Sequence, residues 1–361
     1  MPGNGTIRPG GYMNVLVTGA GGFVGRALVA RLLEDEPSYR LTALLLPSED
    51  EPADWNGRVR VVRGDLRDPS LISTIVADRD LVFHLAAFIS YWRLDRPVME
   101  AVNRDAVTVL VDACIDAGVR RLVHISSVGA VGFRKDGSPA PESEPFNWPE
   151  DFAYMTTKRD GQRIVLDAVR TRGLDAVVVN PASIMGPGDP SPESAHNRLY
   201  RDMYRRSFFF GTFAGGLAIV DVRDLVSAIL AAAKTGRSGE TYLAVGANVP
   251  YSRVLELMAR AAGKVFVPFP IPPLLLGAAG WIMELASVAT RRRPLLTVAY
   301  GRLSGWTAYY SNEKCRSELG VSFRPLEQTI GDASSWYRET FINAKAAAIP
   351  GEAERVDQPD S

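Results

Sequence analysis

Tyr154 and Lys158 are the pair of side chains whose types and spacing most directly suggest chemistry. They lie four residues apart, so a helix would place both on one face. A phenol has a pKa of about 10 in water, and a nearby ammonium group favours the phenolate and lowers that pKa. Tyr154 is therefore predicted to act as a general acid or base on a carbonyl/alcohol pair, although the same spacing also occurs in surface pairs.

A glycine-rich turn near the N-terminus predicts where a partner for this chemistry would bind. The apolar run 13–17 is followed by TGAGGFVG at 18–25 and then by apolar residues at helical spacing. Gly19 permits the tight turn, Gly22 lets the backbone approach a pyrophosphate, and Gly25 lets the helix pack close to the strand. Because the first N–H groups of the helix would face the phosphates, the segment predicts a dinucleotide site.

Alternating strand and helix patterns predict the elements that would position these residues. Further strands are expected at 41–46, 59–62, 81–85, 122–126 and 176–179, with helices at 71–77, 97–117 and 156–172. This alternation predicts an α/β fold, a doubly wound parallel sheet or Rossmann fold, with the ligand at the carboxyl ends of the strands.

The length of 361 residues favours one large domain with a smaller lobe. The dinucleotide-binding domain is expected at 13–180, and a C-terminal substrate lobe at 181–343 is expected to return elements to the main sheet. The segments 1–12 and 344–361 are interpreted as disordered tails, and 1–12 lacks the apolar stretch of a signal peptide.

The composition excludes several classes of function. The 41 Lys and Arg residues balance 41 Asp and Glu residues, so nothing suggests a nucleic-acid partner. Cys114 and Cys315, the two cysteines of the chain, form neither a metal motif nor a disulfide framework. A cytoplasmic location fits this cysteine usage, and no metal site is expected.

Several segments together resemble the extended short-chain dehydrogenase/reductase family, of the NAD-dependent epimerase/dehydratase type. They are the glycine turn and the segments 64–68, 84–87, 125–128, 154–158, 180–189 and 220–224, with Asn103 in between. The resemblance covers nearly the whole chain between the two tails, and this set is far more specific than any one motif.

The resemblance implies a role for each matching residue. Tyr154 would exchange a proton with the substrate oxygen, Ser127 would orient that oxygen, and Lys158 would hold the nicotinamide ribose. The residues implied to bind the cofactor are Gly19, Gly22, Phe23, Val24, Gly25, Asp65, Leu66, Ala86, Ala87, Asn103, Tyr154, Lys158, Pro181 and Ile184. His84 and His124 lie inside apolar strands and are expected to be packed, and His196 is placed in a loop as a candidate substrate contact. By the same resemblance a homodimer is expected, through the helices at 97–117 and 156–172.

The choice between NAD and NADP stays open, with NAD preferred. The second strand ends in LLLPSED at 44–50. An acidic residue at this strand end binds the ribose 2′-hydroxyl of NAD, whereas an arginine accommodates the phosphate of NADP. Leu46 stands where related sequences often carry arginine, and Glu49 and Asp50 follow slightly late.

Two features favour the branch of dihydroflavonol reductase-like and 3β-hydroxysteroid dehydrogenase-like proteins. Val128 follows Ser127 where sugar dehydratases carry acidic residues, and Leu217 and Ala218 stand where nucleotide-sugar enzymes often carry Arg-Asp. Arginines nearby could compensate for that loss; they are Arg198, Arg201, Arg205 and Arg206.

Aromatic and apolar side chains near the expected site also favour this branch. They are Phe88, Ile89, Tyr91, Trp92, Phe208, Phe209, Phe210 and Phe213. The expected activity is therefore an NAD(P)-dependent exchange of a hydroxyl group and a ketone on an apolar small molecule, which would be steroid-, terpenoid- or flavonoid-like. The alternatives are a nucleotide-sugar epimerase and a catalytically silent cofactor-sensing protein; retention of Ser127, Tyr154 and Lys158 speaks against the latter.

The segment 270–293 is apolar and ends in Arg291, Arg292 and Arg293. Its unbroken apolar run, 272–283, is too short to span a bilayer before Glu284. Two readings remain: a packed helix that caps the substrate pocket, or a peripheral membrane anchor whose arginines lie on lipid headgroups.

Overall fold

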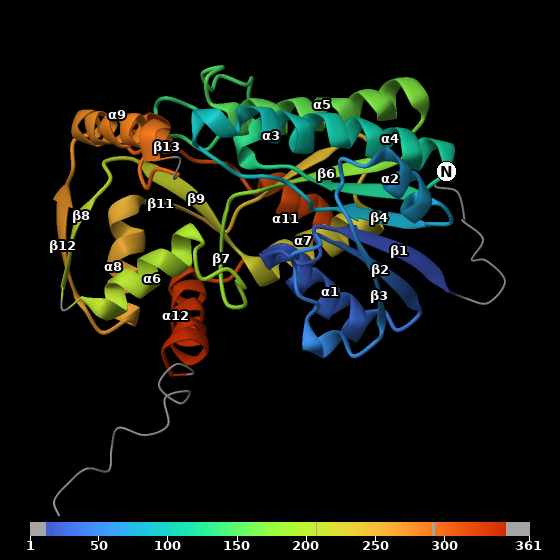
Figure 1. Cartoon of the computed structure of the whole chain (residues 1–361), viewed down its shortest axis with the longest axis horizontal. Helices are drawn as coiled ribbons and strands as arrows, with labels where there is room; N and C mark the ends of the chain where they lie inside the picture. Colours follow the sequence, from blue (N-terminus) through green and yellow to red (C-terminus); the bar gives the residue numbers. More distant parts are fainter. Residues whose placement is uncertain (1–11, 207, 291–292, 344–361) are drawn as a thin grey trace, which may run out of the picture.

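The computed structural model describes residues 12–206, 208–290 and 293–343. A seven-stranded parallel sheet forms the centre of the molecule (Figure 1). Its strands, in spatial order, are β10 (Thr241–Ala244), β6 (Ala176–Pro181), β5 (Arg121–Ile125), β4 (Leu81–His84), β1 (Met13–Thr18), β2 (Tyr39–Leu45) and β3 (Val59–Arg63). The strand order reverses between β1 and β4, which is where a doubly wound sheet binds its ligand. The predicted fold class is confirmed. The two predicted tails lie outside the described residues, except for Tyr12.

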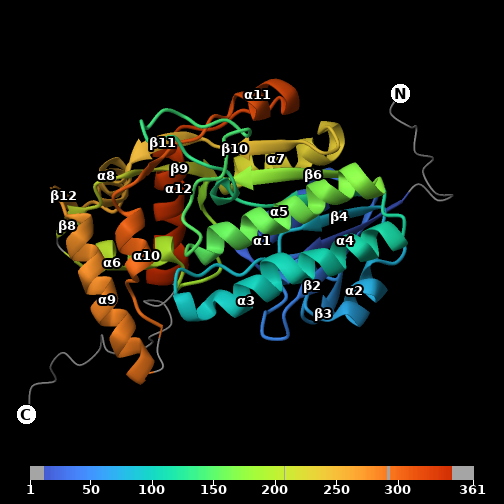
Figure 2. The ribbon, with the colours of Figure 1, turned by 90° about the horizontal axis from the view of Figure 1, so that it is seen from above.

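Helices cover both faces of this sheet (Figure 2). One face carries α2 (Pro69–Val76), α4 (Ala106–Asp116) and α5 (Ala153–Arg172), and the other carries α1 (Phe23–Asp35), α7 (Val222–Thr235) and α11 (Glu313–Leu319). Because helices cover both faces, β1, β5 and β6 are rich in apolar residues and are largely buried on both sides. The sheet separates two cores, one on each face.

The glycine turn between β1 and α1 is built by close backbone contacts. Gly19 has a φ of +68°, which is strained for any residue with a side chain. A Cβ on Gly25 would lie 2.1 Å from the carbonyl oxygen of Gly19, so only glycine lets α1 begin this near the strand. The turn therefore has the geometry that its sequence predicts.

The predicted helix at 97–117 consists of three parts. They are α3 (Arg96–Glu100), a stretch of π-helix, η3 (Ala101–Asp105), and α4. A π-turn widens the helix, and such turns frequently occur at functional sites. Asn103 lies in this stretch.

The C-terminal part forms a smaller lobe beside the sheet and also contributes β10, α7 and α11 to the main layers. A second sheet contains β11 (Ala247–Pro250), β9 (Gly216–Asp221), β13 (Thr307–Ala308) and β7 (Ser183–Met185), and β8 (Phe208–Thr212) pairs with β12 (Val265–Pro270). Its helices are α6 (Ala195–Arg205), α8 (Tyr251–Ala261), α9 (Pro273–Thr290), α10 (Val298–Leu303) and α12 (Leu326–Tyr337). His196 therefore lies on α6 and not in a loop as predicted, and Ser194 caps the helix by accepting a bond from the Asn197 N–H.

We expect two glycines in helix interiors to respond oppositely to substitution by alanine. A Cβ on Gly161, in α5, would lie 2.2 Å from the carbonyl oxygen of Asn103, whereas nothing lies within 4 Å of one on Gly331, in α12. Gly161→Ala should lower the free energy of unfolding by about 1–3 kcal/mol because the two helices must separate. Gly331→Ala should raise it by up to about 1 kcal/mol because alanine favours the helix. Urea unfolding measures both; a stable Gly161→Ala protein would show that α5 does not depend on this approach.

Candidate active site

The end of β5 and the first turns of α5 bring Ser127, Tyr154 and Lys158 together. The Lys158 ammonium group donates a hydrogen bond of 2.8 Å to the carbonyl of Ile125, the last residue of β5. The Ser127 hydroxyl accepts a bond of 3.0 Å from the Gly129 N–H and lies near enough to the Tyr154 hydroxyl to affect its pKa. Ser127 and Tyr154 are 27 residues apart in sequence, and they converge with Lys158 at the carboxyl end of the sheet.

A buried amide holds this strand end against α5. The Asn180 side chain, at the end of β6, donates bonds of 2.6 Å to the Ser127 carbonyl and 2.7 Å to the Gln162 side chain. Gln162 lies one helical turn after Lys158 on α5. The sequence-based reading missed this positioning pair, although the four-residue spacing from Lys158 to Gln162 repeats that from Tyr154 to Lys158.

Burial sets the protonation of the site in this structure. It raises the pKa of Tyr154, and the neighbouring Ser127 hydroxyl only partly opposes that effect. It also lowers the pKa of Lys158 to about 8. The expectation that Lys158 would lower the Tyr154 pKa is therefore not met here: burial raises that pKa, and the ammonium group is bonded to the Ile125 carbonyl.

The glycine turn has the shape that a dinucleotide requires. Gly22 is the N-cap of α1 and makes no side-chain capping bond. The first N–H groups of a helix have no acceptor within the helix, so those of Phe23 and Val24 favour an anion at this end. A Cβ on Gly19 would lie 2.6 Å from the Ala86 nitrogen, which shows how closely the loop after β4 approaches the turn. These residues fit the pyrophosphate of a nicotinamide dinucleotide.

Two other candidate cofactor residues, Asp65 and Leu66, lie in the loop after β3. The Arg67 guanidinium contacts the Asp65 carboxylate at 2.6 Å and, by this side-chain bond, lowers the pKa of that carboxyl group. The Leu66 side chain is buried in the core under α2 and α4. Leu66 can therefore meet a ligand only through its backbone.

Asn103 holds the loop that follows Ala86 and Ala87. Its amide accepts a bond of 2.8 Å from the Phe88 N–H, donates one of 2.9 Å to the Phe88 carbonyl, and donates one of 3.2 Å to the Thr157 hydroxyl. The side chain is buried, and its amide oxygen and nitrogen both have protein partners. Asn103 thus positions the loop beside α5.

The remaining candidates lie at the junction between the sheet and the lobe. Pro181 ends β6 opposite Ala244, and Ile184 lies in β7 opposite Val220. His84 and His124 are buried and stacked, with ring centroids 5.2 Å apart, and burial lowers the pKa of both.

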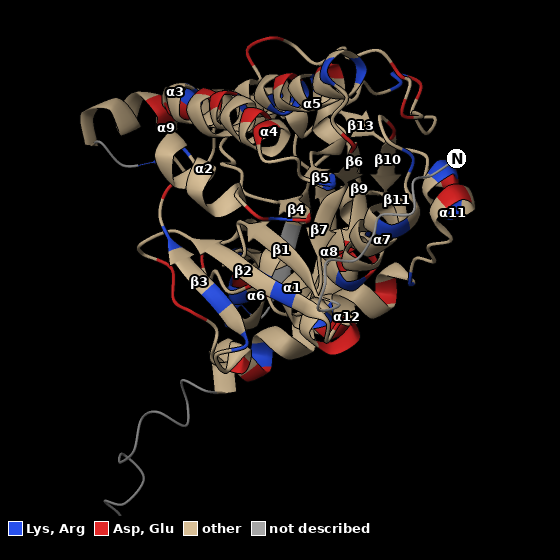
Figure 3. Ribbon diagram, turned by 90° about the vertical axis from the view of Figure 1, so that its right-hand side faces the viewer, with Lys and Arg blue, Asp and Glu red and all other residues tan. Residues whose placement is uncertain are grey.

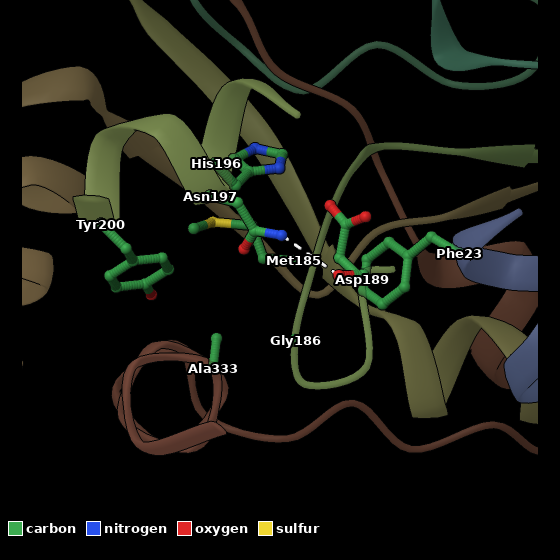
Figure 4. Close-up of a pocket in the computed structure, with 8 residues that line it drawn as sticks. All are labelled: Phe23, Met185, Gly186, Asp189, His196, Asn197, Tyr200 and Ala333. Atoms are coloured by element: carbon green, nitrogen blue, oxygen red, sulfur yellow. Dashed lines mark hydrogen bonds between the residues drawn. The ribbon is translucent and has the colours of Figure 1, made fainter. Parts of the chain in front are cut away.

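His196 lies beside the glycine turn rather than in the Tyr154 cavity. It lines a cavity of about 10 Å³ with Phe23 of α1 and with Asp189, whose carbonyl accepts a bond from Asn197 (Figure 4). That volume holds no more than one water molecule. Burial also lowers the pKa of His196, which favours a neutral imidazole.

A larger cavity of about 290 Å³ opens in front of Tyr154. Its walls come from the loop before α3, the start of α5, and α9 and α10 of the lobe; they include Ser90, Tyr91, Trp92, Arg93, Met99, Phe152, Trp281, Glu284, Leu285, Val298 and Arg302. The Tyr91 ring lies 5.9 Å from Tyr154 and 5.0 Å from Tyr300, centroid to centroid. Two charged groups of the wall, Arg93 and Glu284, approach each other at 3.8 Å.

Only some of the predicted aromatic residues line this cavity. Tyr91 and Trp92 do, whereas Ile89 is exposed and Phe213 packs edge-on against Tyr251 at 5.1 Å. The side chains of 208–210 lie outside those that the structure describes. The contribution of α9 was one of the two predicted roles of the segment 270–293, whereas that of α10, at 298–303, was not predicted.

We expect the buried Lys158 to make stability depend on pH. Its pKa is about 8 in the folded chain against a model-peptide value of 10.5, so the unfolded chain binds more protons between these values. The free energy of unfolding of the wild type should therefore rise, relative to Lys158→Met, by about 3 kcal/mol from pH 7.5 to pH 10.5. Urea unfolding at several pH values measures this, with Lys135→Met at an exposed lysine as control; parallel wild-type and Lys158→Met curves would contradict it.

Comparison with known proteins agrees with this geometry. The sequence pattern of the NAD dependent epimerase/dehydratase family matches residues 15–245. Sterol demethylase protein B of Methylococcus capsulatus is 32% identical, covering 91% of this chain and 99% of that protein. 3beta-hydroxysteroid-dehydrogenase/decarboxylase isoform 1 of Arabidopsis thaliana is 28% identical, with coverages of 87% and 77%. The crystal structure of gox2253 is 29% identical, with a TM-score of 0.74 and coverages of 90% and 98%. The chain belongs to the NAD-dependent epimerase/dehydratase family of extended short-chain dehydrogenases/reductases.

Proposed function

We propose that this protein interconverts a hydroxyl group and a ketone on an apolar, ring-bearing small molecule, with Tyr154 as the general acid/base. The observation that carries the proposal is the position of Tyr154: it lines a cavity of about 290 Å³ together with Tyr91 and Trp92, and the Ser127 hydroxyl lies near enough to its phenol to affect the pKa of that phenol. Relatives named for a sterol and for a 3β-hydroxysteroid support a polycyclic substrate. An aromatic wall suits such rings.

The chain's own residues would handle the proton of the reaction. The nicotinamide, when bound, supplies or accepts the hydride. In reduction, the Tyr154 hydroxyl donates its proton to the substrate oxygen, and the Ser127 hydroxyl donates a hydrogen bond to the same oxygen. Because burial raises the pKa of Tyr154, the phenol holds this proton at neutral pH. Oxidation needs the phenolate, so its rate should increase as the pH rises.

Lys158 would join the cofactor to this proton donor. An ammonium group has three donors, and one of them is directed to the Ile125 carbonyl in this structure. A second donor would serve the hydroxyl groups of the nicotinamide ribose. The residue thereby sets the ribose at the same strand end that carries Ser127.

Within the proposal, NAD is the expected dinucleotide because of Glu49. Its carboxylate accepts a bond of 2.7 Å from the Leu46 N–H and folds back over the glycine turn; a Cβ on Gly21 would lie 2.7 Å from its carboxyl carbon. A carboxylate at this place can accept a bond from the ribose 2′-hydroxyl and repels a 2′-phosphate. The neighbouring Arg26 and Arg63 donate hydrogen bonds to backbone carbonyls.

We expect Tyr154→Phe to abolish turnover while the dinucleotide still binds. Phenylalanine preserves the ring beside Tyr91 but has no proton to give, so kcat should fall by about 10² to 10⁴. The assay follows the absorbance of reduced nicotinamide with a panel of cyclic and polycyclic ketones, with fluorescence titration of NADH as the binding measurement. Tyr204→Phe removes a hydroxyl that bonds Ser334, outside the cavity, and serves as control.

The same assay separates the proposal from nucleotide-sugar epimerisation. Burial raises the pKa of Tyr300, and the Arg198 charge partly opposes that rise. This positive charge near Tyr300 is the feature that favours a phosphate-bearing substrate. UDP-sugars are therefore incubated in parallel and the products analysed for epimers. An epimerised sugar without turnover of any ketone would contradict the proposal.

We expect Glu49 to control the choice of dinucleotide. The wild type should have a higher kcat/KM with NADH than with NADPH, and Glu49→Gln should reduce that ratio by about tenfold or more because the repulsion of the 2′-phosphate is lost. Asp50→Asn, the adjacent acidic residue, is the matched control. A wild type that prefers NADPH, or a ratio that Glu49→Gln leaves unchanged, would rule out this role.

A further inference from the structure

The exposed apolar side chains of the described residues concentrate at one end of the lobe, on β12 and α9. We call this surface the α9–β12 face; its exposed residues are Val265, Val267, Phe269, Leu274, Leu275, Trp281, Ile282, Leu285 and Val288. The exposed fraction of Leu274 is 82% and that of Ile282 is 62%. Among the described residues, α9 is the one helix long and apolar enough to cross a membrane, with a mean hydropathy of 1.4, and 17% of it is buried. Figure 3 shows α9 almost free of charged residues.

α9 buries the opposite kind of side chain from an ordinary surface helix. Its buried residues are Gly280, Glu284 and Ser287, small or polar, and they face α10. A Cβ on Gly280 would lie 2.5 Å from the Thr297 carbonyl carbon, and the Glu284 carboxylate accepts a bond of 3.0 Å from the Val298 N–H. A surface helix in water buries its apolar stripe, so the outward stripe of α9 is arranged for an apolar surrounding.

The contacts of α9 keep it in the fold. A Cβ on Gly301, in α10, would lie 2.5 Å from the Gly277 nitrogen, so the two helices cross at backbone distance. Trp281 and Leu285 also form part of the wall of the Tyr154 cavity. A helix that left this position to span a bilayer would open the cavity, whereas one that lies flat in the headgroup layer keeps both contacts.

Exposed apolar side chains stand on both sides of the cavity. Trp281 and Leu285 stand on the lobe side, and Ile89 and Leu94 are exposed around the loop that forms the opposite wall. Figure 2 shows α9 at the same end of the molecule as α3, which follows that loop. A second copy of the chain on this face would cover the opening of the Tyr154 cavity. A lipid surface would instead leave that opening in contact with acyl chains.

Positive charges border the face. Within 265–290 Glu284 is the single charged residue, and it is buried. Arg93 and Arg293 have exposed side chains, with exposed fractions of 67% and 63%, and approach carboxylates on their inner side at 3.8 and 3.4 Å. Cations beside an apolar helix face are the complement of anionic headgroups.

We propose that the α9–β12 face docks on an anionic lipid bilayer, with α9 in the headgroup layer and the mouth of the Tyr154 cavity open to the acyl chains. An apolar substrate dissolved in the lipid would then reach Tyr154 without crossing water. The route of the substrate rests on the proposed function; the docking itself does not.

Flotation of the full chain with vesicles tests the docking. We expect the wild type to float with phosphatidylcholine vesicles that contain about a quarter phosphatidylglycerol, and several-fold less with pure phosphatidylcholine. The double variant Leu274→Glu/Ile282→Glu should lower binding to the anionic vesicles by at least about tenfold, because each carboxylate would enter the apolar layer. Tyr12→Glu/Ile342→Glu makes the same change at exposed apolar residues outside the face and should bind like the wild type.

Other readouts keep the result interpretable. Neither Leu274 nor Ile282 lines the cavity, so in buffer the double variant should turn over a water-soluble ketone at the wild-type rate and unfold at the wild-type temperature. If it does not fold, Arg293→Gln should still reduce anionic-vesicle binding several-fold. A wild type that stays with the soluble fraction, or a double variant that floats equally well, would refute the docking.

Gel filtration tests whether a second copy of the chain, rather than a bilayer, covers the α9–β12 face. A wild-type dimer that the double variant separates, without vesicle binding by either, would assign the face to a second copy and overturn the proposal. A wild type that binds vesicles but turns over no ketone would refute the proposed function and leave the docking intact.

Discussion

A buried ammonium group is the interaction on which the candidate site depends. Lys158 is tied to the Ile125 carbonyl at the end of β5, and this bond sets the rotation of α5 against the sheet. One turn earlier on the same helix, Tyr154 is thereby brought to Ser127. On the same helix, Gly161 lets α5 approach the π-helical stretch at backbone distance. Keeping a charge in this buried place is costly, and such costs are typical of sites that serve chemistry rather than stability.

The same helix also organises the two sides of the cavity. Thr157 contacts Asn103, which holds Phe88 by two hydrogen bonds and so fixes the loop that carries Tyr91 and Trp92. The loop after β4 touches the glycine turn at its beginning and lines the cavity at its end. Cofactor cradle, proton donor and aromatic wall are therefore parts of one packed unit.

The lobe completes this unit with α9, a helix that buries small or polar side chains and exposes apolar ones. Glu284 caps the start of α10 from the inner face of α9, while the outer face presents leucine, isoleucine and tryptophan. Trp281 and Leu285 of this helix line the Tyr154 cavity and are also exposed on the outer face. This arrangement suits a substrate that is poorly soluble in water, and it gives the C-terminal segment a role in reaching the substrate as well as in enclosing it.

Local spacing along the chain is enough to predict the alternating strands and helices, the glycine turn before α1, and the placement of Tyr154 and Lys158 on one helix face. These features follow from backbone geometry within a few residues. Only the folded chain reveals that the Tyr154 pKa is raised, that Glu49 folds back onto the glycine turn, that His196 lies on a helix and that α9 turns an apolar face outward. Each of these depends on burial or on contacts between distant segments, which the local sequence pattern cannot predict.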